Sequence, residues 1–321
     1  MPEVAVITRT MTRPYLLRRA IQSVLSQFFE DYEMIIVNDG GDPKHVDKAL
    51  EVAFRERPEL ERFANKIRVI HHKKNKGMEA ASNTGIRASD SRYIVIHDDD
   101  DSWHPAFLER TVSYLDAPPL PTIKGVITKT LVVFERLIGW DIIYEDTVPF
   151  EPWVKNWDWN ADMGMERVVI PYDKLCEMNL FPPISFVFSR KVYDKVGGFN
   201  ENLPVLGDWD FHMKFAAVAD IGIIWSRLAY YHHRRTNNPL LGNTVIAGKS
   251  KHTLYFDYLR NSILRKTLPP KDIAKDLRDI IVSRSPVREE SVWWKFAIVR
   301  YEALANKLLN MLYKIKGLFR R

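Results

Sequence analysis

Short apolar runs alternate along this chain with longer segments whose apolar residues recur at helical spacing. Four runs rich in β-branched residues predict buried strands, at residues 4–7, 33–37, 67–70 and 93–96. The segments between them predict amphipathic helices, at about residues 15–28, 43–57 and 79–88. This strand–helix–strand order is typical of βαβ units in a parallel sheet, which binds its ligands beyond the carboxyl ends of the strands.

The fourth apolar run ends at four consecutive carboxylates, Asp98, Asp99, Asp100 and Asp101. Adjacent acids repel one another, so a buried strand end tolerates them when a cation shares their charge. This pattern predicts a metal site. The alternative is a solvated acidic turn, which is how most short acidic runs are found.

Polar groups also follow the other predicted strands. Asp39 lies in an Asn-Asp-Gly turn after the second run, and Lys73, Lys74 and Lys76 lie in a loop before a helix. A nucleotide fits this layout: Asp39 would accept from a base, the lysines and the helix N-terminus would face phosphates, and the acidic run would hold a metal. Taken singly, these features are equally typical of a turn and a solvated face.

The composition is that of an ordinary globular protein, with 46% apolar and 27% charged residues among 321. A single cysteine, Cys176, excludes an internal disulfide framework. The sequence shows no N-terminal signal and no run of eighteen apolar residues, so we expect a cytoplasmic protein.

The net charge of +6 is concentrated near the C-terminus. Residues 292–321 carry seven basic side chains and one acidic one, which equals the whole net charge, so the rest is neutral and nucleic acid is not the expected partner. Residues 287–321 predict a basic amphipathic helix with aromatic anchors, which favours an anionic membrane surface on the inner face of the cell membrane. The alternatives are packing on its own domain or on a second copy in a homo-oligomer.

Several motifs in order resemble glycosyltransferase family 2, the inverting transferases with the GT-A fold, over roughly residues 3–240. They are Val-Ala-Val-Ile-Thr-Arg-Thr with Arg-Pro at 4–14, Ala-Ile-Gln-Ser-Val-Leu-Ser-Gln at 20–27, Val-Asn-Asp-Gly at 37–40, Asn-Thr-Gly-Ile at 83–86 and the acidic run at 98–101. The resemblance implies that Asp98 and Asp100 bind a divalent metal, Mn²⁺ or Mg²⁺. The residues that it places around a nucleotide-sugar donor are Thr8, Arg9, Thr10, Asp39, Lys76, Asn83, Asp99 and Arg234.

The second half resembles the acceptor side of the same family. The Gly-Asp-Trp-Asp-Phe stretch at 207–211 matches its catalytic motif, which implies that Asp208 is the general base. The chemistry needs such a group, because a sugar hydroxyl is a poor nucleophile until a carboxylate takes its proton. The alternative role of Asp208 is to cap a helix, and an N-cap position is compatible with catalysis.

The chain departs from the family pattern in three places. Arg9-Thr10-Met11-Thr12 replaces Pro-Thr-Tyr-Asn, Ser82 replaces an arginine whose phosphate contact would pass to Lys76, and Arg234 takes the place of a histidine near the diphosphate. His232 and His233 beside it are candidate metal ligands. Four tryptophans in and before the non-periodic stretch 142–183 suggest either a sugar-binding loop or ordinary aromatic packing, at positions 140, 153, 157 and 159.

We therefore expect one GT-A domain at residues 1–265, with a Rossmann-like nucleotide half (1–105), an acceptor half (106–265), a mixed central sheet and a helical C-terminal extension (266–321). The expected activity is inverting transfer of a sugar from a nucleotide-diphosphate donor to a glycan or glycolipid acceptor in cell-surface synthesis. A nucleotidyltransferase, or a catalytically silent membrane-associated scaffold that binds nucleotide, is the alternative.

Overall fold

The structure is a computed structural model, and it describes residues 1–138, 141–150, 167–235 and 249–267. Its strands are β1 (Val4–Thr10), β2 (Tyr32–Asp39), β3 (Ile67–His72), β4 (Tyr93–Asp98), β5 (Ser102–Trp103), β6 (Ile123–Ile138), β7 (Asp141–Pro149), β8 (Phe186–Ser189) and β9 (Asp220–Arg235). Its α-helices are α1 (Pro14–Leu25), α2 (Pro43–Glu56), α3 (Met78–Arg87), α4 (Phe107–Asp116), α5 (Tyr172–Glu177), α6 (Arg190–Val196), α7 (Gly207–Ala216) and α9 (Lys249–Thr267), with 3₁₀ segments η1 (Pro58–Lys66) and η3 (Pro183–Ser185).

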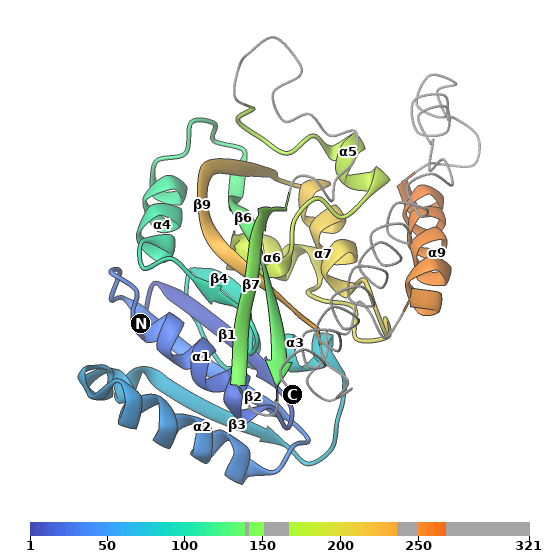
Figure 1. Ribbon diagram of the computed structural model, residues 1–321. Helices are drawn as coiled ribbons and strands as arrows, with labels where there is room; N and C mark the ends of the chain where they lie inside the picture. Colours follow the sequence, from blue (N-terminus) through green and yellow to red (C-terminus); the bar gives the residue numbers. More distant parts are fainter. Residues whose placement is uncertain (139–140, 151–166, 236–248, 268–321) are drawn as a thin grey trace, which may run out of the picture. The chain divides into compact units, whose positions relative to one another are not determined.

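The described strands form one mixed sheet in the order β3-β2-β1-β4-β8-β6-β9-β5, with β7 paired to β6 (Figure 1). Strands β1 to β4 are parallel, as the sequence predicts, and β8 begins the mixed half by pairing antiparallel to β4. The parallel register places Arg9 of β1 beside Asp98 of β4, and Thr10 beside Asn38 of β2. The predicted GT-A architecture is confirmed, and the carboxyl ends of these strands meet at one edge.

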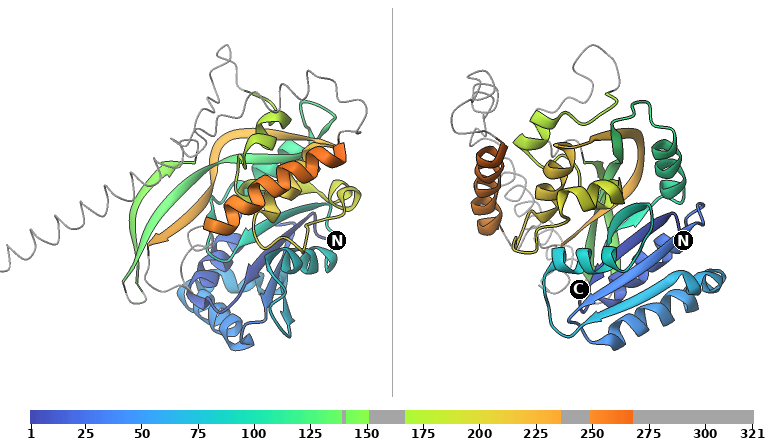
Figure 2. Two further views of the ribbon diagram at one scale, coloured as in Figure 1. Left: turned by 90° about the vertical axis from the view of Figure 1, so that its right-hand side faces the viewer. Right: turned by 180° about the vertical axis from the view of Figure 1, so that it is seen from behind.

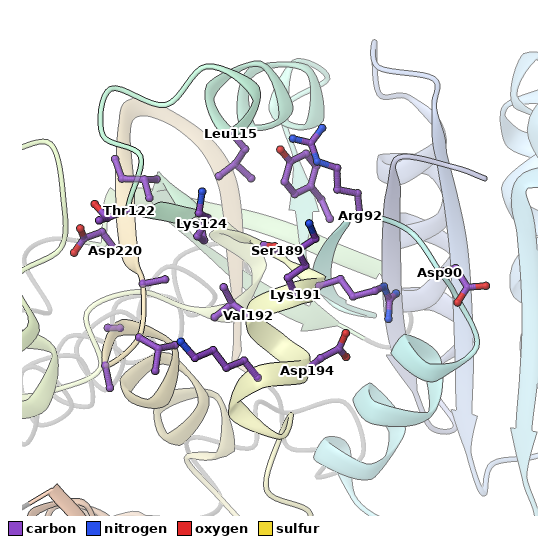
Figure 3. A pocket seen from close by; sticks show the side chains of 18 residues that line it. Asp90, Arg92, Leu115, Thr122, Lys124, Ser189, Lys191, Val192, Asp194 and Asp220 are labelled. Carbon is purple, nitrogen blue, oxygen red and sulfur yellow. The ribbon is translucent and has the colours of Figure 1, made fainter.

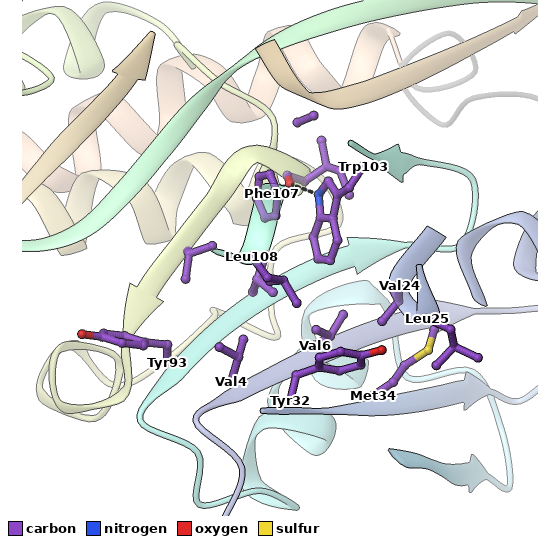
Figure 4. Close-up of a cluster of buried hydrophobic side chains, with 14 of the residues drawn as sticks. Val4, Val6, Val24, Leu25, Tyr32, Met34, Tyr93, Trp103, Phe107 and Leu108 are labelled. Atoms are coloured by element: carbon purple, nitrogen blue, oxygen red, sulfur yellow. Dashed lines mark hydrogen bonds between the residues drawn. The ribbon is translucent and has the colours of Figure 1, made fainter. Parts of the chain in front are cut away.

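Both faces of the parallel half are buried, which explains its uninterrupted apolar runs. Ala5 and Ile7 of β1 face one core cluster, while Val4 and Val6 face the other, because successive side chains point to opposite faces of a strand. Figure 4 shows part of the second cluster. There Trp103, two residues after the acidic run, donates its indole N–H to the Ile184 carbonyl over 2.7 Å, which fixes the chain just beyond the run.

Two strands, β6 and β9, are long and curved (Figure 2). The end of β9 brings His232 and Arg234 to the acidic run that ends β4. The two strands run parallel, and their register pairs Glu135 with Arg234 and Val133 with His232. The sequence predicts a mixed sheet but not these two strands, because their apolar residues are interrupted by Thr, Lys and Arg. Their ends supply the second side of the candidate site.

Some predictions concern residues outside the described ranges. The four tryptophans of the non-periodic stretch and the whole basic segment 287–321 lie there. Within the described part of the chain, no helix has both the length and the apolar content needed to cross a membrane.

Candidate functional site

The acidic run at the end of β4 is neutralised by arginines from other elements. Asp98 accepts from Arg9 Nε on the neighbouring strand, with 2.8 Å between Nε and Oδ1. The carboxylate of Asp98 remains 24% exposed, while the side chain of Arg9 is only 9% exposed. Burial alone would lower the pKa of Arg9, but Asp98 and Glu79 outweigh it and hold the guanidinium in its charged form.

Asp99 is fully buried and faces the loop after β1. Its Oδ2 accepts from the Thr10 hydroxyl over 2.7 Å and from Arg13 Nε over 3.2 Å. Burial raises the pKa of Asp99 to about 6, against the opposing charge of Arg13. These contacts argue against the predicted direct donor contact by Asp99, because its side chain reaches no solvent. It orients Thr10 and Arg13 instead.

Asp100 lies between two arginines. Arg13 Nη1 is 3.3 Å from its Oδ2, and Arg234 Nη2 contacts the same oxygen. Burial alone would raise the pKa of Asp100, but the two guanidinium groups outweigh it and hold that pKa well below its usual range. Arg234, which is predicted to contact the donor, is only 2% exposed. Its guanidinium lies at the acidic run and contacts Asp100.

His232 has both ring nitrogens engaged by side chains. Nδ1 lies 2.7 Å from Glu135 Oε1, and Nε2 lies 2.7 Å from the Ser102 hydroxyl. These contacts argue against His232 as a metal ligand in this arrangement. Its backbone N–H donates to Asp101 over 2.9 Å, so β9 is tied to the last carboxylate of the run.

Asp39 organises the basic loop that follows β3. Its Oδ1 accepts from the Lys76 amide over 2.9 Å and faces His72 Nδ1 at 2.7 Å, while its Oδ2 accepts from the Gly77 amide over 2.9 Å. A carboxylate has about four acceptor positions, two on each oxygen. Two of these contacts use Oδ1 and one uses Oδ2, so Oδ2 has one acceptor position left for a further donor. The side chain of Lys76 is exposed.

Asn83 is predicted to contact the donor, and in this structure its side chain is engaged within the protein. Its amide donates to the Phe199 carbonyl over 2.9 Å and to Glu201 over 2.8 Å, while its oxygen accepts from the Tyr193 hydroxyl and the Phe199 amide. All four hydrogen-bonding positions of the side chain are therefore used. Asn83 anchors α3 to the segment before α7, and motif similarity alone does not distinguish this role from ligand binding.

Thr8 is the first of the three predicted donor residues on β1. It is fully buried within β1, and its hydroxyl makes no hydrogen bond in the described part of the chain. Its side chain offers no accessible group to a donor. Of the three predicted residues at the end of β1, Arg9 and Thr10 contact the acidic run and Thr8 belongs to the core.

Glu79 connects the acidic run to α7. Its Oε2 lies 3.8 Å from Arg9 Nη1, and its carboxyl packs directly against Gly207, where an added Cβ would come within 2.4 Å of it. Burial, opposed by Arg9, raises the pKa of Glu79 to about 7. Asp98, Arg9, Glu79 and Gly207 thus form a continuous path that brings Asp208 to the same site.

Asp208 is the second residue of α7, so it is not the N-cap. That position belongs to Leu206, whose φ of 62° lies in the left-handed region. Burial raises the pKa of Asp208, while the Trp209 amide, Asn179 and Arg9 oppose that rise. A carboxylate with a raised pKa beside an acidic strand end is suited to accept a proton.

A divalent metal would have to rely on few protein ligands. No three His, Cys, Asp or Glu side chains converge as a ligand group among the described residues. Asp98 and Asp100 still fit in kind, because the arginines contact Oδ1 of one and Oδ2 of the other and leave one oxygen of each without a hydrogen bond in the described structure. Mg²⁺ is commonly held by one or two carboxylates together with substrate phosphates and water.

A cavity of about 920 Å³ lies at the opposite edge of the sheet, at the starts of β4, β6 and β9 (Figure 3). Its lining includes Arg92, Lys124 and Lys191 as well as Asp90 and Asp220. It contains none of the residues predicted for the donor, the metal or the base. We therefore assign the candidate site to the carboxyl edge.

Sequence reasoning did not identify Arg13, Glu79, Glu135 or Asn179 as part of the site. Arg13 stands next to Pro14 in a recognised motif, but its partners Asp99 and Asp100 are more than eighty residues away, so the local sequence does not indicate the pairing. Asn179 lies in a stretch without periodicity, and no signal in the sequence marked it.

Comparisons with known proteins find similar chains and similar folds. The family model described as Glycosyl transferase family 2 matches residues 5–137. The chain is 24% identical over 291 residues to "Uncharacterized glycosyltransferase YwdF" of Bacillus subtilis, covering 91% of this chain and 95% of the relative. It is 27% identical to an uncharacterized glycosyltransferase of Rickettsia felis, of which it spans only 32% while 68% of this chain is matched.

Two solved structures share the fold. S. aureus TarS 1–349 in complex with UDP-GlcNAc aligns with a TM-score of 0.56 at 15% identity, covering 89% of this chain and 74% of that one. The mannosyltransferase PcManGT from Pyrobaculum calidifontis, in complex with GDP-Man and Mn²⁺, aligns with a TM-score of 0.54 at 14% identity, covering 96% and 87%.

Proposed function

Because the chain belongs to glycosyltransferase family 2 and is a glycosyltransferase, we propose that it moves a sugar from a nucleotide-diphosphate sugar to an acceptor hydroxyl with inversion at the anomeric carbon. One observation carries this proposal. The acidic run and Asp208, which are more than a hundred residues apart, belong to one site through Arg9 and Glu79. A glycosyl transfer needs both a group that binds the diphosphate and a base that faces the acceptor.

On the donor side, the edge formed by β1, β2 and β4 would hold the nucleotide. Asp39 keeps an acceptor position for a base N–H. The exposed Lys76 lies in the loop that leads into the N-terminus of α3, a position suited to a phosphate. Arg13 and Arg234 place positive charge at Asp100, beside the expected diphosphate.

On the acceptor side, Asp208 would take the proton of the attacking hydroxyl. The oxygen of a sugar hydroxyl gains nucleophilicity as its proton leaves, and attack opposite the leaving diphosphate inverts the anomeric carbon. The burial that raises the pKa of Asp208 makes it a stronger base than an exposed carboxylate, while Arg9 favours its ionised form.

Asp98 and Asp100 would hold a divalent cation of the Mg²⁺ or Mn²⁺ class. When bound, such an ion stabilises negative charge on a departing diphosphate. The mannosyltransferase with GDP-Man and Mn²⁺ supports this assignment by similarity of fold. Arg9 and Arg13 partly neutralise the same carboxylates, so they keep the site folded whether or not a cation is present.

The acceptor in this proposal is a glycan or glycolipid of cell-surface synthesis, and the domain at residues 1–265 would carry out the transfer. The basic segment at 287–321 would hold the enzyme at the inner face of the membrane. This part of the proposal rests on charge and apolar pattern in the sequence.

The direct test is a panel of nucleotide sugars that includes UDP-GlcNAc and GDP-mannose. The full chain with Mn²⁺ should release a nucleoside diphosphate and free or transferred sugar from at least one of them. Release of pyrophosphate from a nucleoside triphosphate would instead identify a nucleotidyltransferase. Nucleotide binding without turnover of any donor would identify a silent scaffold.

A further inference from the structure

A short chain of side chains behind Asp208 is not used by the proposed mechanism. We propose that Asn179 is a positioning residue for Asp208, and that His212 fixes the orientation of the Asn179 amide. This inference rests on the proposed role of Asp208 as general base. Asn179 lies between α5 and η3, and Asp208 and His212 lie one helical turn apart on α7.

The contacts fix which end of the amide faces the base. Asn179 Nδ2 lies 2.7 Å from Asp208 Oδ2, and Asn179 Oδ1 lies 3.2 Å from His212 Nδ1. A carboxylate only accepts, so the amide must turn its N–H₂ toward Asp208, since the reverse orientation would place two acceptors together. The Asn179 oxygen then also only accepts, and His212 Nδ1 must carry the ring proton.

Packing and burial restrict His212 to donating its Nδ1 proton to Asn179. Its side chain is buried, and its ring packs against Phe181 and Phe186 with centroid distances of 4.2 and 5.3 Å. Burial lowers the pKa of His212 to about 3, so the imidazole is neutral at every pH at which the enzyme would work. A neutral ring with a fixed orientation supplies one N–H donor and no competing charge.

The arrangement has a clear consequence for the base. The hydrogen bond from the Asn179 amide engages Oδ2 of Asp208 and so fixes how the carboxylate is turned toward an acceptor hydroxyl. Because Asn179 donates without being able to give up its proton, it stabilises the ionised carboxylate and does not compete for the substrate proton.

The charged groups around Asp208 act in both directions. Arg9 of β1 favours its ionised form, while Asp98 of β4 and Glu79 of α3 oppose it. Asp210 of the same helix is paired with Lys214 over 2.5 Å. The Asn179 donor is therefore one of few groups that favour the ionised base at a buried position.

The test is the pH dependence of kcat/KM for hydrolysis of UDP-GlcNAc or GDP-mannose by the full chain. Loss of one hydrogen bond to a charged group corresponds to roughly one pH unit. Asn179→Ala should therefore move the acidic limb upward by about one unit, with little change in donor KM. His212→Phe keeps the aromatic packing and should move it in the same direction by less. The exposed Asn202 offers a matched control, and Asn202→Ala should leave the profile in place.

A second measurement needs no substrate. The difference in stability between the parent and Asp208→Asn, followed from pH 4 to 9, reports the native pKa of Asp208. Since that pKa is raised, the parent loses stability relative to Asp208→Asn as the pH rises through it, and Asn179→Ala should extend the loss to higher pH.

The outcomes separate the two proposals. If Asn179→Ala lowers rate or stability equally at every pH without moving either titration, Asn179 has only a packing role and this inference is wrong. If Asp208→Asn keeps its rate, the proposed function itself fails. If the enzyme hydrolyses neither sugar, the stability titration alone decides for or against Asn179.

Discussion

Arg234 reaches from the end of β9 to Asp100 at the end of β4, across 134 residues of sequence. The arginine side chain is fully buried, and the carboxylate side chain is 11% exposed. A buried ion pair of this kind holds the mixed half of the sheet to the parallel half at the candidate site. It also places a fixed positive charge where the proposal expects a diphosphate.

Arg234→Met should therefore destabilise the fold. Removing one partner of a buried pair costs up to about 3–5 kcal/mol of unfolding free energy, and Arg13, which also contacts Asp100, keeps part of that charge compensated. Urea denaturation measures this, and Asp100→Asn in the same chain should restore part of the loss. Arg55→Met, which breaks an exposed pair with Glu51, is the control and should change stability little. Equal effects of the two arginine variants would contradict the assignment.

The contact between Glu79 and Gly207 predicts a second effect. A Cβ at position 207 would lie 2.4 Å from the Glu79 carboxyl, so Gly207→Ala should cost about 1–3 kcal/mol through overpacking. In a chain that already carries Glu79→Ala, the same glycine change should cost much less. Thermal or urea unfolding of the four chains measures this coupling, and strict additivity would show that the two residues do not touch in solution.

The sequence predicts the parallel half of the fold well, because buried strands such as β1 and β4 leave plain apolar runs. It does not resolve β6 and β9, where Thr130, Lys129 and Arg136 interrupt the pattern on long curved strands. Those strands are stabilised by pairing with each other over many residues, and such tertiary pairing has no local signature.

The site is predictable only in part for a similar reason. Motifs place Asp98, Asp100 and Asp208 near one another, but they do not say what each polar group contacts. Asn83 and Asp99 belong to the correct motifs and yet use their hydrogen bonds internally. Arg13 depends on pairing between distant segments, which becomes visible only in the folded chain.

A metal prediction follows from the acidic run. Asp100→Asn removes a charged oxygen from a hard cation, so it should abolish turnover and weaken Mn²⁺-dependent binding of a nucleoside diphosphate. Calorimetry with and without Mn²⁺ measures the binding. Full activity of the parent enzyme in EDTA would refute a metal role for this site.

A prediction for the basic segment concerns anionic membranes. Each basic residue near an anionic surface contributes about 1 kcal/mol, and raised salt screens that attraction. Deleting residues 291–321 should release the protein from anionic liposomes while leaving donor hydrolysis largely unchanged. If the intact chain ignores liposomes and the deletion alters its oligomeric mass, the segment is an assembly element.

The central claim is that Asp208 deprotonates the acceptor and contributes little to binding of the donor. Asp208→Asn keeps the shape of the side chain and removes its basicity, so kcat should fall by about two or more orders of magnitude. The decisive measurement is kcat for transfer or hydrolysis of the accepted nucleotide sugar, together with the dissociation constant of that donor, in the parent and in Asp208→Asn. The account predicts a large loss of kcat at nearly unchanged donor affinity. A collapse of donor affinity together with rate, or a retained rate, would contradict it.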